Sequence, residues 1–417
     1  MTMTRRAALA ATVGGFGLAL TGVRTARAAE GEPIRLGFLT VKTGPLASGG
    51  IQMEQGVTLA LKERNNMLAG RPVTLFTADT GGVPANTRSK TQELIERDNV
   101  QCILGPLAAF EALAIDDYTQ SQKMPIMSVA AAEDITQRKP DPWFVRCTSS
   151  SAQCSHVMGD YAAKDLKYKR VALIADDIAY GHEQNAGFQH VFEDAGGHVV
   201  QKLWPPLNAP DYGSYIAQLN PKLDAIFMAF AGSNGFRFSK QFFEYGMGGK
   251  VPLLGGMTAV DEAVLQQMGD DAIGMLSVNW YSAQLDNPAN KVFVAGMQRD
   301  YKVDPGYYAA GTYVSVAVLD AALKSVDGKI EDREAFMHAL RTNQVPDTAR
   351  GPVRFDSFGN VVGNVYIRKV ERKGGRLVNS VIKTYPDVSQ FWTYNQDAFL
   401  KNPVYSRDNP PAKFIEN

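Results

Sequence analysis

Short apolar runs alternate with longer amphipathic segments along most of this chain. One clear unit runs from Val100 to Asp134, where apolar residues 102–104 and 125–127 flank a helical segment at 109–122. A strand, a helix and a second strand in so short a span form a βαβ unit, whose two strands are parallel. The loops after both strands then face the same side of the sheet, where open α/β sheets bind ligands.

The same alternation precedes and follows this unit. It predicts strands at 35–41, 73–78, 171–175, near 199, and at 225–229, 253–254 and 275–278. It predicts helices at 53–66, 87–98, 153–165, 181–195, 234–245, 291–301, 307–324 and 333–342. Breaks at 147–151 and 279–281 interrupt the pattern, and three segments after 350 alternate like antiparallel strands between Gly-containing turns. The pattern predicts an α/β fold with parallel sheets and a C-terminal antiparallel appendix.

Length and charge narrow the class of protein. A chain of 417 residues is long enough for two domains. Lys+Arg and Asp+Glu both number 43, so the charge balance gives no support for a nucleic-acid partner or an anionic membrane surface.

The first 28 residues have the pattern of an export signal rather than of a folded segment. Arg5 and Arg6 precede an apolar run at 7–20, and a small-residue cleavage site ends at Ala28. The arginine pair is a loose match to the twin-arginine motif, so both that route and the Sec route stay open. We expect a soluble, exported, periplasmic protein.

Three cysteines leave two possibilities. Cys147 and Cys154 flank a short polar loop and could pair in an oxidising compartment, or all three thiols, including Cys102, could be buried and free. Because no CxxC motif is present, the spacing indicates neither a zinc site nor a redox site.

The sequence lacks the common motifs of catalytic, metal-binding and cofactor-binding sites. It contains no phosphate-binding Gly-rich loop, no nucleophile elbow and no pair of histidines at zincin spacing. We therefore expect no enzyme activity, no metal site and no cofactor. An exported two-lobed α/β protein without such groups is most simply a binding protein that closes on its ligand by hinge motion.

Several segments resemble one family in order and spacing. They are IRLGFLTVKTGPLA, VQCILGPLAAFEALA, MPIMSVAAAEDIT, AYGHEQ, DAIFMAF, PLLGG and YYAAGTYVSVAVLDAAL, followed by GPVRFDSFGN. From Ile34 to Val370 the chain resembles the leucine/isoleucine/valine-binding type (type I) of periplasmic solute-binding protein, which serves ABC importers.

The resemblance implies two doubly wound lobes joined by a three-segment hinge. Lobe one would comprise 31–148 plus 280–348, and lobe two 149–279 plus 349–417. It also implies a monomer that delivers a small molecule to an ABC membrane permease.

The resemblance further implies a ligand site in the loops between the lobes. Its residues would be Thr43, Leu107, Ala108, Ala109, Phe110, Ala130, Ala131, Ala132, Tyr180, Ser233, Gly256, Met257, Thr258 and Tyr281. In this family a ligand carboxylate binds backbone N–H groups of two lobe-one loops, which match Ala108–Phe110, Ala130 and Ala132. Helix N-termini suit that role because they offer unpaired N–H donors and a partial positive charge.

Two departures from amino-acid-binding members bear on the ligand. Ala109 and Ala132 lack the usual side-chain hydroxyls, and the loop at 256–258 lacks the acid that would hold an ammonium group. An ammonium group buried without a counter-charge would cost several kcal/mol. Asp261 or Asp134 could restore such an acid, and Arg146 could hold a carboxylate or pair with an acid.

These departures predict a small carboxylate ligand, an aromatic acid in particular. A branched-chain amino acid or an amide is the alternative within the family. Outside transport, the first alternative function is a ligand sensor that signals to a membrane protein. A catalytic α/β enzyme is a more remote alternative.

Overall fold

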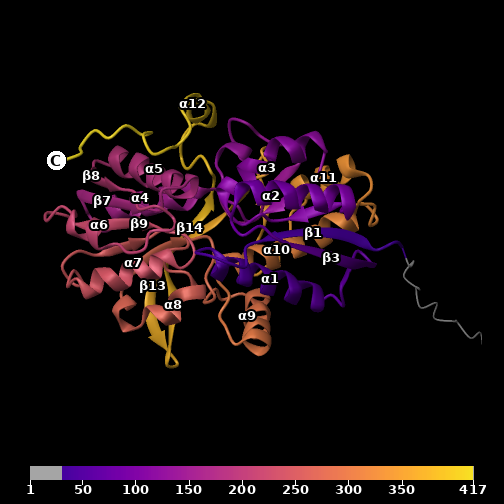
Figure 1. The fold of residues 1–417 in the computed structure, drawn as a ribbon, viewed down its shortest axis with the longest axis horizontal. Coiled ribbons are helices and arrows are strands. Elements are labelled where there is room, and N and C mark those ends of the chain that lie inside the picture. Colours follow the sequence, from indigo (N-terminus) through magenta and orange to yellow (C-terminus); the bar gives the residue numbers. More distant parts are fainter. Residues whose placement is uncertain (1–30, 417) are drawn as a thin grey trace, which may run out of the picture.

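The computed structural model describes residues 31–416, which form two α/β lobes side by side (Figure 1). The export signal expected at 1–28 lies outside the described residues. Across residues 31–416, none of the helices combines the length and the apolar character that a membrane crossing requires.

The first lobe is built on a six-stranded sheet in the order β2-β3-β1-β4-β5-β6. The strands are β1 (Ile34–Thr40), β2 (Met67–Leu68), β3 (Arg71–Asp79), β4 (Cys102–Leu104), β5 (Ile126–Ser128) and β6 (Phe144–Arg146). All neighbours pair in parallel except β2, which pairs antiparallel with β3. Its helices are α1 (Ala47–Lys62), α2 (Pro84–Gln92) with a π-helical turn at Glu93–Arg97, α3 (Ala109–Ser121), α9 (Pro288–Tyr301), α10 (Tyr307–Ser325) and α11 (Arg333–Thr342), and a 3-10 turn lies at Asp134–Thr136.

The second lobe carries an eight-stranded sheet in the order β12-β13-β11-β10-β9-β7-β8, with β14 paired to β13. The strands are β7 (Arg170–Ala175), β8 (His198–Leu203), β9 (Ala225–Ala229), β10 (Leu253–Gly255), β11 (Leu276–Asn279), β12 (Arg354–Phe355), β13 (Val361–Lys373) and β14 (Arg376–Val388). Its helices are α4 (Ser151–Lys164), α5 (Ala179–Asp194), α6 (Gly213–Ala217), α7 (Asn234–Glu244), α8 (Glu262–Met268) and α12 (Gln396–Lys401), with a 3-10 turn at Asp270–Ala272. Strands β12–β14 are antiparallel, which confirms the predicted appendix.

The chain passes between the two sheets three times. The crossings lie between β6 and α4, between β11 and α9, and between α11 and β12. In Figure 1 the violet and orange parts of the chain therefore share one lobe, and the magenta and yellow parts share the other. This arrangement confirms the predicted fold class of two doubly wound lobes.

Among the predicted helices, the bounds differ most at the start of α1, which begins six residues earlier than expected. Glycines 49 and 50 read as a loop, yet they belong to the first turns of the helix. A Cβ at Gly50 would lie 1.8 Å from the carbonyl oxygen of Val41, and one at Gly49 would lie 2.6 Å from the ring of Tyr308. Gly50 allows a close approach to the backbone of Val41, and Gly49 leaves room for the ring of Tyr308. The sequence pattern does not distinguish these roles from a turn.

The three cysteines are free and buried. The structure therefore favours the second of the two possibilities, in which Cys147 and Cys154 do not pair. Burial raises the pKa of each thiol to about 12, so all three stay protonated and poorly reactive at neutral pH.

Candidate ligand-binding site

A small cavity lies between the lobes, at the carboxyl ends of the parallel strands. Its lining comes from loops of both lobes: Leu46, Leu107, Ala108, Ala109, Val129, Ala131, Ile178, Tyr180, Ala231, Tyr307 and Tyr308. The cavity measures about 20 Å³, which is room for about one water molecule. An aromatic ligand can enter only if the lobes open or the lining side chains move.

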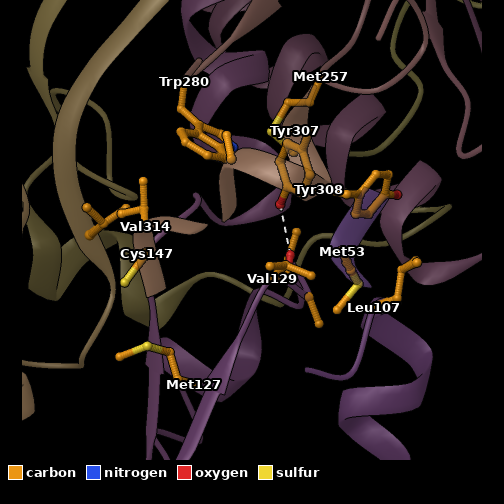
Figure 2. Packing of buried hydrophobic residues seen from close by; sticks show 14 of the residues in the cluster. Met53, Leu107, Met127, Val129, Cys147, Met257, Trp280, Tyr307, Tyr308 and Val314 are labelled. Atoms are coloured by element: carbon orange, nitrogen blue, oxygen red, sulfur yellow. Dashed lines mark hydrogen bonds between the residues drawn. The ribbon is translucent and has the colours of Figure 1, made fainter. Parts of the chain in front are cut away.

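Aromatic side chains pack together beside this cavity, among them Trp280, Tyr307 and Tyr308 (Figure 2). The hydroxyl of Tyr307 donates a hydrogen bond to the carbonyl oxygen of Val129, at 2.9 Å. The ring of Tyr307 stands edge-on to Trp280, at 5.4 Å between centroids, and to Tyr308, at 5.0 Å. Aromatic rings favour edge-to-face and offset-stacked pairs, so this cluster offers partners to a further aromatic ring.

Four helices begin at the cavity wall. Leu46 is the N-cap of α1, Ala108 that of α3 and Ile178 that of α5, while Tyr307 is the first residue of α10. Each N-terminus carries a partial positive charge of roughly half a unit. No charged side chain of residues 31–416 lines the cavity, while two carboxyl groups outside the lining, those of Glu111 and Asp261, already accept N–H groups at the starts of α3 and α10.

Some of the N–H donors expected for the ligand are already engaged. The N–H of Ala108 donates to Oε2 of Glu111 at 2.9 Å, and the N–H of Ala130 donates to Oγ of Ser128 at 2.9 Å. Glu111 is held by Thr80 and Thr87, while burial raises its pKa. In this structure the N–H groups of Ala108 and Ala130 are therefore not free to bind a ligand, contrary to the prediction. The N–H groups of Ala109 and Phe110 have no acceptor among the described residues, and they remain the donors of this helix start.

The loop at 130–132 is positioned by Arg146, which is fully buried. Nη1 of Arg146 donates to the carbonyl oxygens of Ala130 at 3.0 Å and Ala132 at 2.8 Å, and Nε donates to Asn360 at 2.8 Å. Ser151 also holds this loop, through its N–H and its hydroxyl, at the carbonyl oxygen of Ala131. Arg146 thus orients the loop and does not itself line the cavity.

The two acids that could have held an ammonium group have other roles. Asp261 accepts the N–H of Ala263 at 3.0 Å and that of Tyr307 at 2.7 Å, and burial raises the pKa of its carboxyl group. Asp134 lies 3.7 Å from Arg138. Neither acid lines the cavity.

The remaining predicted residues fall into two groups. Tyr180 lines the cavity and shares a 2.8 Å hydrogen bond with Thr258, whose hydroxyl donates to the carbonyl oxygen of Phe230. The other predicted residues have no place in the lining of the closed cavity: Thr43, Phe110, Ala130, Ala132, Ser233, Gly256, Met257, Thr258 and Tyr281.

Three of the predicted residues outside the lining have other surroundings. Thr43 is exposed, and Tyr281 is buried with its hydroxyl donating to Asn290 at 2.7 Å. The N–H of Ser233 donates to the carbonyl oxygen of Pro45 across the lobes, at 3.2 Å. Tyr281 therefore belongs to the packing near the hinge, and Ser233 to the contact between lobes.

Sequence reasoning missed part of the lining. The missed residues are Leu46, Val129, Ile178, Ala231, Tyr307 and Tyr308. For Tyr307 and Tyr308 a signal was present, since a pair of tyrosines directly follows Gly306 at the start of a long apolar helix. Large amphipathic rings at a helix N-terminus are suited to a half-polar site.

A pair of buried acids lies beside the site and connects the lobes. Glu133 follows the loop at 130–132, and its N–H donates to Oε1 of Glu183 on α5, at 3.3 Å. The N–H of Ala152 donates to Oε1 of Glu133 at 2.6 Å. Burial, and then the charge of Glu133, raise the pKa of Glu183 to about 8, while burial raises that of Glu133.

This pair predicts a stability that falls as the pH rises. The folded protein holds the proton of Glu183 more tightly than the unfolded chain does. Its contribution is complete below about pH 4.5 and is lost as the pH rises through about 8. We expect Glu183→Gln to be more stable than the parent by roughly 2–4 kcal/mol at pH 8.5, with little difference at pH 4.5, as measured by urea unfolding. Glu244→Gln, at an exposed site, is the control; parallel pH profiles for parent and Glu183→Gln would contradict the expectation.

Comparison with known proteins agrees with this architecture. A family model described as "Periplasmic binding protein" matches residues 33–376. Leu/Ile/Val-binding protein homolog 6 of Brucella abortus (strain 2308) is 24% identical over 368 residues, covering 86% of this chain and 93% of the relative.

Two solved structures are more similar in sequence. An ABC transporter substrate-binding protein from Sphaerobacter thermophilus is 31% identical with a TM-score of 0.80, covering 86% of this chain and 99% of that one. A solute-binding protein of an ABC transporter from Rhodopseudomonas palustris BisB5, solved with 3,4-dihydroxybenzoic acid, is 31% identical with a TM-score of 0.82, covering 86% and 98%. These similarities confirm the resemblance inferred from the sequence, and the chain belongs to the periplasmic binding protein family, as a solute-binding protein of the ABC-transporter type.

Proposed function

We propose that this protein captures a small aromatic carboxylate between its lobes and delivers it to an ABC permease. One observation carries the proposal: four helix N-termini surround a cavity whose lining has tyrosines and aliphatic residues but no charged side chain. Such a cavity favours an anion with an apolar body.

The ligand's two ends would meet different parts of the site. The carboxylate would accept hydrogen bonds from the N–H groups of Ala109 and Phe110 at the start of α3. The ring would pack against Tyr180, Tyr307 and Tyr308, which come from both lobes. Contacts from both lobes would stabilise the closed form, the form that the permease would recognise.

An α-amino acid fits this cavity less well. Its ammonium group would be enclosed without an acid, at a cost of several kcal/mol. The Rhodopseudomonas palustris BisB5 protein, solved with 3,4-dihydroxybenzoic acid, supports the aromatic class, while the Brucella relative's name supports a branched-chain amino acid as the second candidate.

The proposed lobe boundaries follow the three crossings, with lobe one at 31–148 plus 280–348 and lobe two at 149–279 plus 349–417. We further propose that residues 1–28 direct export to the periplasm and are then removed. We also propose that the mature protein is a monomer.

Calorimetry and thermal shift on residues 29–417 test the ligand class. We expect 3,4-dihydroxybenzoate or benzoate to bind and to add about 2.7 kcal/mol of stability at 100 times its Kd. Benzamide, which has nearly the same shape but no charge, should bind at least tenfold more weakly, and leucine should not bind. Binding of leucine without binding of any aromatic acid would overturn the proposal.

A further inference from the structure

Arg350 lies on the third crossing between the lobes, between α11 and β12, and it is only 3% exposed. Nη1 of this arginine donates hydrogen bonds to the carbonyl oxygens of Cys147 and Thr148, at 2.6 Å for Thr148. Those two residues form the first crossing. The guanidinium carbon also lies 4.6 Å from the ring centroid of Trp280, on the second crossing. One side chain therefore touches all three crossings of the hinge.

This buried cation has no counter-charge from the described part of the chain. No carboxylate among residues 31–416 forms an ion pair with Arg350. Arg368 differs in this respect, because it is equally buried but lies 3.4 Å from Glu262. Burial lowers the pKa of Arg350, and the nearby groups that act on it are tyrosines and cysteines. Buried charges in proteins are normally paired, so an unpaired guanidinium calls for an anion from solution.

A cavity of about 270 Å³ lies against this side chain. It is lined by Gln344, Val345, Pro346, Arg350, Pro352, Val353, Arg354, Val362, Gly363, Asn364 and Asp387. Nε and Nη2 of Arg350 have no acceptor among the described residues, and Gly363 leaves room beside Nη2, which a Cβ there would approach to 2.9 Å. Asp387 is paired with Arg354 at 2.9 Å, so its charge is already balanced.

We propose that this hinge cavity is a second anion site, for a small carboxylate held by the free donors of Arg350. A guanidinium with two adjacent N–H donors matches the two oxygens of a carboxylate. The valine and proline walls suit a short apolar body. Inorganic phosphate has no apolar body to pack against the valine and proline residues, so it gains less from this lining. None of its lining residues lines the cavity between the lobes, so the site does not depend on the proposed function.

An anion bound here would act on the hinge. Arg350 contacts the first and second crossings directly, so balancing its charge stabilises the packing of all three crossings in the closed arrangement. A carboxylate at Arg350 and a ligand between the lobes would then favour the same form, and each would tighten the binding of the other.

Propionate is the probe for the first experiment, with the mature protein in a buffer free of other carboxylates. We expect the Tm to rise by about 2 °C at ten times the Kd, with no rise for the neutral propionamide and a smaller one for phosphate. Ala109→Asp, which fills the site between the lobes, should keep this rise, and Arg350→Gln should lose it. Loss of the rise in Ala109→Asp would place propionate between the lobes and overturn the proposal, as would an unchanged rise in Arg350→Gln.

A crystal structure of the parent protein grown in propionate decides the question if Arg350→Gln does not fold. Density for a carboxylate against Nε and Nη2 of Arg350 supports the site. Water alone at that position, under conditions that raise the Tm, overturns it.

Discussion

Ala109→Asp is expected to abolish the binding of an aromatic carboxylate, with an affinity loss of at least about 100-fold. Ala109 is the first residue of α3, is 2% exposed and lines the cavity. An aspartate there brings its own carboxylate to the N–H donors that the ligand would use. The helix itself tolerates the change, because acidic residues stabilise the first turn. Isothermal titration of parent and variant with 3,4-dihydroxybenzoate measures the loss.

Ala109→Asn is the matched control, since asparagine has almost the same size and no charge. We expect it to lose clearly less affinity than Ala109→Asp, because only the steric part of the change remains. Circular dichroism and Tm confirm that both variants fold. Equal losses in the two variants would show that size alone matters at this position and would remove the carboxylate from the start of α3.

Local patterns predicted the strands and helices well where apolar runs are short and end at strong breaks. The bounds of β4 and β9 match the predicted ranges, and α11 matches at both ends. The structure of these segments follows from the periodicity of their apolar residues and from the turn residues that flank them. Both signals are local in the sequence. The strand β6 was missed because its three residues stand among prolines and a tryptophan without any alternation.

The site was predicted only in part, because its composition depends on contacts between distant segments. The loops at 107–109 and 131 were found from their place after two parallel strands. The hydrogen bond from the N–H of Ala108 to Glu111 is part of the helix cap, and its effect on the site became visible only in the structure. Tyr307 reaches the cavity only because the chain returns to the first lobe between β11 and α9, and it lies nearly 180 residues after the loop it contacts.

The same dependence on distant contacts makes Arg146 a residue whose loss should strongly lower stability. Its donors satisfy the carbonyl oxygens of Ala130 and Ala132 and the side chains of Asn360 and Thr136, all in the interior. Its charge also offsets that of the buried Glu133. We expect Arg146→Met, which keeps the length of the side chain, to lower the free energy of unfolding by roughly 3–5 kcal/mol. Urea unfolding at pH 7 measures the change.

Arg146→Lys separates the charge from the hydrogen bonds. Lysine keeps the positive charge beside Glu133, but its ammonium group is compact and cannot reach the four acceptors that the planar guanidinium reaches. We expect it to recover part of the stability and little of the ligand affinity, because the loop at 130–132 would still lack its two carbonyl contacts. If Arg146→Lys restored both stability and affinity, charge alone would account for Arg146. If Arg146→Met remained within about 1 kcal/mol of the parent, the loop would be held by Ser151 and the backbone, and Arg146 would have no part in shaping the site.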